Sequence, residues 1–265
     1  YLVPVATMVG AQHHGGLVLG AFLPGGEAVG LSFAFLGRIG ERLGLYSQLT
    51  GVVPGYQGQR LGERLKQAQR EYAHAQGLPV IAWAFDPLQA GNAHFNLARL
   101  GATVGRYIDD MYGPRTDTLN AGVPTDRVIA EWDTDPAAVR PPIAPAEALT
   151  SPRLLTLRDG APLSAPDGAA LAGPRVRLEV PADIARLRAH APSEAEAWRR
   201  AVREAFRVAL AAGFRAVGFV RDEPAAPRQS PASLVIAAAT TVSPTTCTRM
   251  SVPATRRWNC VGHQR

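Results

Sequence analysis

The residues best suited to chemistry form one short loop, Gln57-Gly58-Gln59-Arg60-Leu61-Gly62. An apolar run over residues 43–53 leads to Pro54, which ends a strand because proline has no N–H to donate. A helix-period pattern then covers residues 61–76. The N–H groups of such a loop, and the first N–H groups of the helix behind it, lack intrahelical partners and favour a phosphate. The loop therefore predicts a phosphate-bearing ligand.

Two familiar phosphate loops are excluded by their spacing. A nucleotide-hydrolysing loop ends in Gly-Lys-Ser/Thr, so that the lysine reaches the phosphates and the hydroxyl holds Mg²⁺, whereas this loop ends in Gly62-Glu63-Arg64. A dinucleotide-binding fingerprint needs G-x-G-x-x-G, and the glycines at 55, 58 and 62 have the wrong intervals.

The loop instead resembles the acyl-CoA loop of the GNAT superfamily of N-acyltransferases, whose motif is (R/Q)-x-x-G-x-(G/A) after an apolar strand ending V-x-P. Gln57 and Gly62 match this motif, and Val52-Val53-Pro54 precedes them. Arg60 stands where the motif has glycine. Glycine there permits a positive φ or a close approach of the backbone to pyrophosphate, so the Arg60 side chain must point away or contact a phosphate itself.

The surrounding elements follow the order of that superfamily. Apolar runs at 17–23, 27–35 and 43–53, the first two joined by a Pro-Gly-Gly turn, predict three antiparallel strands before the loop. A fully apolar run at 80–85 predicts a buried strand that stops at Asp86-Pro87. The resemblance implies a mixed α/β GNAT fold, and later segments are similar to a bacterial branch of the superfamily.

A helix is expected from residue 92, capped by Asn92 and ended by Gly101. The superfamily's helix there reads N-x-x-A-x-x-F-Y-x-K-x-G-F, which Asn92, Phe95 and Gly101 match in type. Asn96 stands where that family often has a tyrosine that protonates the departing thiolate, and an amide cannot act as such an acid.

Catalytic candidates stay open at this point. Tyr107 and Tyr112, both expected in the next strand, could replace the missing acid or be structural. Many relatives carry a glutamate on the strand before the loop, but residues 46–51 have no carboxylate. Asp86 is a candidate base, and spacing does not separate it from the alternatives Asp109, Asp110 and Glu131.

The resemblance also implies the binding roles. Val52 and Val53 would offer backbone groups to the pantetheine arm, and Asn92 and Phe95 would flank its reactive end. The pyrophosphate would lie on the loop residues Gln57, Gly58, Gln59, Arg60, Leu61 and Gly62. The expected function is transfer of an acyl group, most simply acetyl, from acyl-CoA to an amine of a small molecule or peptide. A non-catalytic acyl-CoA-binding or regulatory module is the alternative.

The domain organisation is expected to have four parts: a GNAT domain over 1–132, a linker over 133–152, a C-terminal α/β extension over 153–221 and a weakly structured tail over 222–265. In the extension, a helix over 193–212 begins with a capping-box-like Ser193-Glu194-Ala195-Glu196. Its apolar face leaves Arg199 and Arg203 to point elsewhere. Asp126-Arg127 is expected to form a buried pair or to bind a substrate carboxylate.

Composition narrows the class of protein. Five of the six net positive charges come from arginines after residue 224, where no acid occurs, and the rest of the chain is nearly neutral. No basic stripe with interleaved aromatics is present, so nucleic-acid binding is not expected. No apolar run approaches the roughly 20 residues that span a bilayer. Cys247 and Cys260 have no zinc-type spacing, so no metal is expected. A cytoplasmic location is the default, and a homo-oligomer is left open.

Overall fold

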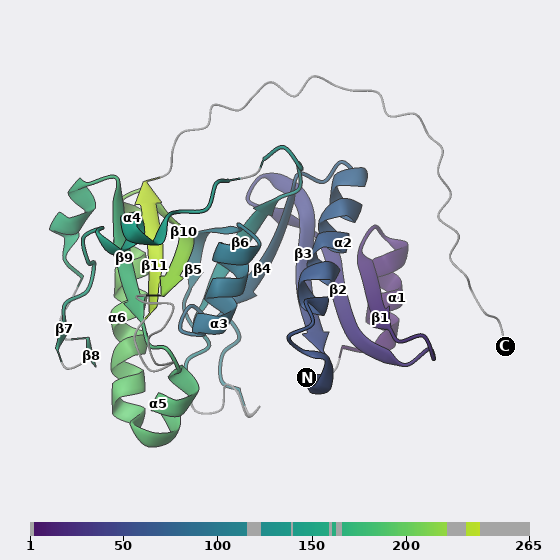
Figure 1. Ribbon diagram of the computed structural model, residues 1–265. Coiled ribbons are helices and arrows are strands. Elements are labelled where there is room, and N and C mark those ends of the chain that lie inside the picture. The colour runs from purple at the N-terminus through teal and green to yellow at the C-terminus, as the bar shows by residue number, and fades with distance from the viewer. Residues whose placement is uncertain are drawn as a thin grey trace.

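The computed structural model describes residues 3–115, 123–138, 140–158, 161–162, 166–221 and 232–238. Within them a nine-stranded mixed sheet has the order β1-β2-β3-β4-β6-β5-β10-β11-β9 (Figure 1). Its strands are β1 (Leu17–Phe22), β2 (Ala28–Ile39), β3 (Arg42–Val52), β4 (Val80–Phe85), β5 (Thr103–Ile108), β6 (Arg127–Asp133), β9 (Arg175–Val180), β10 (Phe214–Arg221) and β11 (Ala232–Ala238). The mixed α/β class expected from the sequence is confirmed.

The helices are distributed along the length of this sheet. They are α1 (Val5–His13), α2 (Leu61–Ala75), α3 (Ala90–Ala93), α4 (Pro145–Leu149), α5 (Ile184–His190) and α6 (Pro192–Ala211), with the short helices η1 (Pro54–Tyr56), η2 (His94–Arg99, a π-helix) and η3 (Gly168–Ala172). A separate pair of short strands is formed by β7 (Leu157–Arg158) and β8 (Ala161–Pro162). None of the helices in the described ranges is long and apolar enough to cross a membrane.

The first half of the sheet has the expected strand order. β1, β2 and β3 form an antiparallel meander, and β3 then lies parallel to β4. The connection between β3 and β4 contains α2, which buries Leu65, Gln69 and Ala73 on one stripe and packs against all four of these strands. Gly77, with φ of 68°, lets the chain leave the helix.

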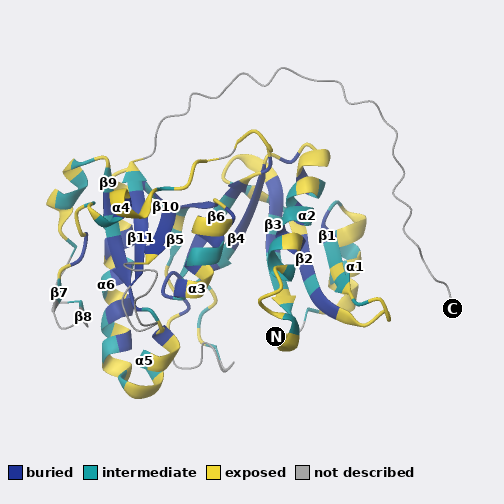
Figure 2. Ribbon diagram, in the orientation of Figure 1, coloured by how far each residue is buried: buried dark blue, intermediate teal, exposed yellow. Residues whose placement is uncertain are grey.

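The C-terminal part extends the same sheet across the expected boundary at residue 132. β10 joins β5, and β11 lies between β10 and β9. α6 packs against β5, β9 and β10, and it buries Trp198 and Phe206 in the same apolar cluster as Leu45 and Ile81 of the first half. Figure 2 shows buried residues along the whole sheet. One core therefore serves both parts.

Several local expectations are corrected. Residues 232–238, expected in a weakly structured tail, form β11, where Leu234 and Ile236 are buried because strands lie on both sides. The expected linker contains α4 with Ala148 fully buried. Gln89 rather than Asn92 precedes α3, and α6 begins after Ala191 without a side-chain cap instead of at the capping box. Most of the expected tail, including both cysteines, lies outside the described residues.

Candidate functional site

The loop between β3 and α2 takes the shape that its glycines predict. η1 follows β3 directly, and residues 57–60 then connect it to α2. Gly58 has φ of 80°, and Arg60 has φ of 61° in the left-handed region. The position where the GNAT motif has glycine thus does require a positive φ, and an arginine adopts it at a cost of roughly 1–2 kcal/mol. We call residues 57–62 the anion loop.

The anion loop presents a row of unused backbone donors. Among the described residues, no acceptor is found for the six consecutive N–H groups from Gly58 to Glu63. By contrast, the N–H of Gln57 donates to Pro54 O at 3.2 Å and that of Arg64 to Arg60 O at 3.0 Å, on either side of the row. Free N–H groups at a helix N-terminus attract anions because the helix dipole adds to their partial charges.

Gly62 has no reason within the protein to be glycine. A Cβ built on it would meet only a methyl group of Val52, at 4.0 Å, and its φ is not positive. Glycine in the first turn of a helix is less favourable than alanine by roughly 0.5–1 kcal/mol. Open space beside free N–H groups is what a ligand that approaches the backbone closely would need.

The charges near the anion loop are mutually paired. Arg60 donates twice to Glu63, and Arg99 on η2 donates to the same carboxylate at 2.5 Å. The hydrogen bond from Arg60, with help from Arg99, holds the pKa of Glu63 below its usual range. The Arg60 side chain is largely exposed and paired with Glu63, and its contact with a phosphate stays a prediction. An open pocket of about 460 Å³ lies beside it along α2, lined by Gln59 and Arg64 among others.

The strand ends expected to meet a ligand already have partners. The Val53 N–H donates to Val29 O at 3.0 Å, and the Val53 carbonyl accepts from the Tyr56 N–H at 2.8 Å. The Val52 carbonyl accepts from the side-chain amide of Gln57 at 3.1 Å. Gln57 therefore ties the loop to the end of β3, and the contact of both valines with a pantetheine arm stays a prediction.

β3 and β4 part after Tyr46, and β3 continues from there to Val52, which leads to the anion loop. Their parallel ladder contains two residue pairs, Leu45 with Ile81 and Tyr46 with Ala82, although both strands continue. We call the point just after these pairs the fork. A register shift in β2 lets Phe33 pair with Leu49 and the next residue with Ser47, so Gln48 bulges from β3 at the fork. A bulge there frees backbone groups beside the opening.

Tyr46 stands at the fork with a buried hydroxyl. Among the described residues this hydroxyl meets no partner at hydrogen-bonding geometry, although Tyr112 lies beside it. Burial raises the pKa of Tyr46, and Tyr112 raises it further. The ring stacks at 5.4 Å from Phe35, which is partly exposed. The Tyr112 hydroxyl and the Ala84 backbone are neighbours of the Tyr46 hydroxyl, and a protonated hydroxyl that makes no well-aligned hydrogen bond to them can still donate one to a ligand.

η2 carries the other expected ligand contacts. Asn92 is exposed on α3, Phe95 packs against the core at intermediate burial, and Asn96 is buried with 5% exposed. Gly101 has φ of 73°, so it ends this helical segment as expected. None of these three side chains is an acid, so the acid that the family motif implies is absent from position 96.

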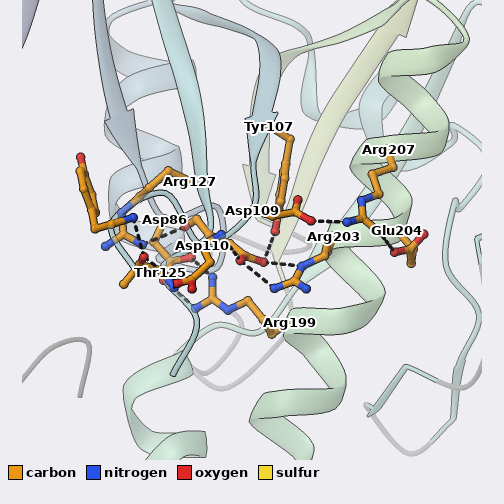
Figure 3. A network of polar contacts seen from close by, with 12 residues as sticks. Asp86, Tyr107, Asp109, Asp110, Thr125, Arg127, Arg199, Arg203, Glu204 and Arg207 are labelled. Atoms are coloured by element: carbon orange, nitrogen blue, oxygen red, sulfur yellow. Dashed lines mark hydrogen bonds and ion pairs between the residues drawn. The ribbon is translucent and has the colours of Figure 1, made fainter. Parts of the chain in front are cut away.

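Two catalytic candidates from the sequence are engaged elsewhere, in the network of Figure 3. Asp86, directly after β4, accepts two hydrogen bonds from Arg199 of α6. The Tyr107 hydroxyl donates to Asp126 at 2.6 Å, and burial and that contact raise the pKa of Tyr107. The third candidate, Tyr112, lies beyond β5 in a turn rather than in the strand, and Arg127 stacks on its ring.

The same network contains residues that the sequence reasoning missed. Arg199, Arg203 and Arg207 repeat every fourth residue on α6 and pair with Asp86, Asp126 and Asp109. We call these three the arginine ladder. Asp126 pairs with Arg203 rather than with its neighbour Arg127, which donates to the Asp126 carbonyl. The spacing of four residues between these arginines could have indicated the cluster from the sequence, because it places all three on one helix face.

Comparison with known proteins gives structural similarities alone. No protein-family model and no curated protein matches the chain. It is similar to an IAA acetyltransferase from Bacillus cereus ATCC 14579, at 17% identity and a TM-score of 0.39 over 49% of this chain and 82% of that one. It is also similar to the NatB acetyltransferase complex bound to a bisubstrate inhibitor, at 15% identity and a TM-score of 0.41, over 50% of this chain and 77% of that one. A third similar structure is Chaetomium thermophilum Naa20 in complex with a bisubstrate analogue, at 13% identity and a TM-score of 0.42, over 50% of this chain and 74% of that one.

Proposed function

We propose that this chain is a GNAT-type acyltransferase that moves an acyl group, most simply acetyl, from acyl-CoA to an amine. The row of six free N–H groups from Gly58 to Glu63, open at Gly62, carries the proposal. Pyrophosphate has the charge and the oxygen acceptors that such a row binds. The fork between β3 and β4 lies on the strand that leads into this row, and it would receive the pantetheine arm.

In this proposal the anion loop binds and the fork positions the reacting atoms. The pyrophosphate accepts from the loop N–H groups, and the exposed Arg60 and Arg64 lie near the nucleotide end of the ligand. Asn92 and Phe95 lie on the helical segment that follows β4 and flank the thioester. Holding both reactants together supplies much of the rate enhancement of amine attack on a thioester.

Acyl transfer requires one proton to be moved. The acceptor nitrogen attacks the thioester carbonyl, the C–N bond forms, the C–S bond breaks and the thiolate leaves. Tyr46, whose hydroxyl lies at the fork, donates its proton to the thiolate as the C–S bond breaks. The phenolate then takes up the proton that the new ammonium group releases. Tyr46 therefore takes the part that the sequence left to Tyr107, Tyr112 or Asp86.

The test is calorimetric titration of acetyl-CoA into the protein and into Gly62→Asp. We expect micromolar binding, about −8 kcal/mol, which the loop carboxylate abolishes by repelling pyrophosphate. Gly168→Asp is the matched control, because Gly168 is exposed on η3 with nothing within 4 Å of a built Cβ. No heat with acetyl-CoA, longer acyl-CoAs or free CoA would refute the proposal.

The alternative is a non-catalytic acyl-CoA-binding module. Two observations favour it: β3 carries no carboxylate, and Asn96 takes the place of the family's tyrosine. To separate the two functions, the protein is incubated with acetyl-CoA and a panel of small amines and peptides, and the released CoA is measured by chromatography. Binding without CoA release from any acceptor would establish the module. The acceptor class, the absence of nucleic acid among the ligands and the cytoplasmic location remain predictions.

A further inference from the structure

Lys66 is the only lysine in the sequence, and every other basic position apart from the six histidines is arginine. Arginine keeps its proton at all accessible pH values, whereas a lysine amine loses its proton readily when it is buried. The chain therefore has one ε-amine, and its position decides what chemistry that amine can do.

The amine of Lys66 lies at the fork. Its Nζ donates to Ser47 Oγ at 2.8 Å and lies 3.8 Å from the centre of the Trp83 ring. Ser47 follows Tyr46 on β3, and Trp83 follows Ala82 on β4, so Lys66 lies between the first two residues that the parallel ladder leaves unpaired. The residue is 4% exposed. The amine thus occupies the place where the strands part, on the side covered by α2.

The partners around Lys66 are uncharged. Ser47 donates to the side-chain carbonyl of Gln69 at 3.0 Å, and the Gln69 amide donates to Ser32 at 2.7 Å. Ser32 in turn shares a hydrogen bond of 2.7 Å with Thr50. This chain of neutral groups holds Ser47 in place. No carboxylate of the described residues pairs with Lys66.

Most charged groups on the neighbouring elements are bonded elsewhere, and Arg64, Glu71 and His74 of α2 are exposed. β1 and β4 contain no titratable side chain. Arg38 on β2 donates to Glu41 O, and Arg42 on β3 pairs with Glu131. On α2 itself, Glu63 pairs with Arg60 and Arg99. Arg70 of the same helix donates to two backbone carbonyls.

Burial without a counter-charge changes the state of the amine. It lowers the pKa of Lys66 to about 7, far below the usual value of about 10.4. A large fraction of the amine is then neutral at neutral pH and carries a free electron pair. Neutral lysine amines in apolar surroundings are nucleophiles for carbonyl carbon.

We propose that Lys66 is an acyl acceptor within the chain, acylated at Nζ by the acyl-CoA that the anion loop binds. The inference rests on the proposed function of that loop. The Nζ electron pair attacks the thioester carbonyl, a C–N bond forms and the C–S bond breaks. One amine proton passes to the departing thiolate, so CoA leaves as the thiol and Lys66 becomes a neutral amide.

The product suits a buried position better than the protonated form of Lys66 does. A buried ammonium without a counter-ion is costly, whereas an amide needs hydrogen bonds alone, and Ser47 provides one partner. Acylation also removes the single ε-amine at the fork. The modification would therefore change how the fork receives a further acyl-CoA molecule.

The experiment incubates the purified full chain with isotope-labelled acetyl-CoA and follows its intact mass, with peptide mapping to locate the label. We expect one acetyl group on Lys66, formed at a rate that does not depend on protein concentration. In Gly62→Asp the rate should fall at least tenfold, because the donor no longer binds. Lys66→Arg and Lys66→Met should take up no label at this position, and circular dichroism checks that they fold.

Calorimetry keeps the two proposals distinguishable. Acetyl-CoA binding together with an unmodified Lys66 overturns this inference and leaves the proposed function standing. Labelling of Lys66 at equal rates in the wild type and in Gly62→Asp also overturns it, since the acetyl group would then come from solution. Label found on the chain's N-terminal amine alone, and not on Lys66, would also overturn the inference. Absence of binding overturns both.

Discussion

Arg199 and Asp86 are joined by two parallel hydrogen bonds, from Nη1 to Oδ1 at 2.7 Å and from Nη2 to Oδ2 at 2.8 Å. Both side chains are largely buried, with 7% and 14% exposed. Asp86 directly follows β4, one strand of the fork, and Arg199 belongs to α6 of the C-terminal part. The pair therefore fixes the C-terminal part against the strand that positions the proposed thioester.

The middle pair of the arginine ladder is expected to matter most for stability. Asp126 is fully buried, so Arg203→Met leaves a carboxylate without its counter-ion and should lower the free energy of unfolding by about 3–5 kcal/mol. Urea denaturation measures the change. Arg200→Met is the control, since Arg200 pairs with Glu196 on the exposed face of the same helix and its loss should cost under about 1 kcal/mol.

Low pH should reduce the difference in unfolding free energy between the wild type and Arg203→Met. Burial by itself would raise the pKa of Asp126, but hydrogen bonds from Arg203 and Tyr107 bring it below the usual value. The carboxylate is therefore stabilising above a pH of about 4, and this contribution is lost as the pH falls through the folded-state pKa. Denaturation of wild type and Arg203→Met should give converging stabilities at low pH, and a constant difference would contradict the assignment.

The left-handed conformation at position 60 predicts an unusual order of stability among variants of this residue. Arg60→Gly should be more stable than Arg60→Ala by about 1 kcal/mol, because alanine at φ of 61° is strained and glycine is not. Thermal unfolding of the two variants measures the difference directly. Alanine as the more stable variant would show that the loop does not hold this conformation in solution.

Tyr46→Phe tests the proton donor. The hydroxyl contributes to the step in which the thiolate leaves, so we expect a fall in kcat of about 100-fold with little change in KM for acyl-CoA. Tyr72→Phe is the matched control, because the Tyr72 hydroxyl donates to Gly16 O on the opposite side of α2 from the fork. An unchanged kcat in Tyr46→Phe would remove this residue from the mechanism.

The pKa of Lys66 predicts how stability depends on pH. Its value is lower in the folded chain than in the unfolded chain, so the unfolded chain binds the additional proton between about pH 7 and 10.4. The free energy of unfolding should therefore rise with pH in this window, by up to about 1.4 kcal/mol per unit. In Lys66→Met this rise should disappear. Denaturant unfolding at three pH values makes the comparison, and parallel curves would show that the wild-type amine keeps its proton in the folded chain and that its pKa is not lowered.

The sequence predicted what local patterns determine. The apolar run before Pro54, the glycines at 58 and 62 and the stripe that includes Leu65 together fixed β3, the anion loop and α2. These signals are contained within about 25 residues, and the elements depend on little else. At the one local departure, Arg60, the sequence left two reasons for the family's glycine, a positive φ or a close approach of the backbone, and the structure has a positive φ.

The tertiary part of the site could not be predicted in the same way. Tyr46 looked like an ordinary strand residue, since its importance comes from where β3 and β4 part and not from its neighbours in sequence. Asp86 and Tyr107 appeared to be available because their partners, Arg199 and Asp126, are distant along the chain. Pairings of this kind depend on which strand lies beside which, and no local pattern contains that information.

The position of β11 sets the order in which the chain can fold during synthesis. β9 pairs with β11 through six residues, and β11 joins it to β10, yet β11 is the last described strand to be made. At roughly 5–20 residues per second, β9 waits several seconds after it is synthesised before this partner exists. The nascent chain thus exposes an unpaired strand edge for that time, while the meander, α2 and the anion loop can already assemble.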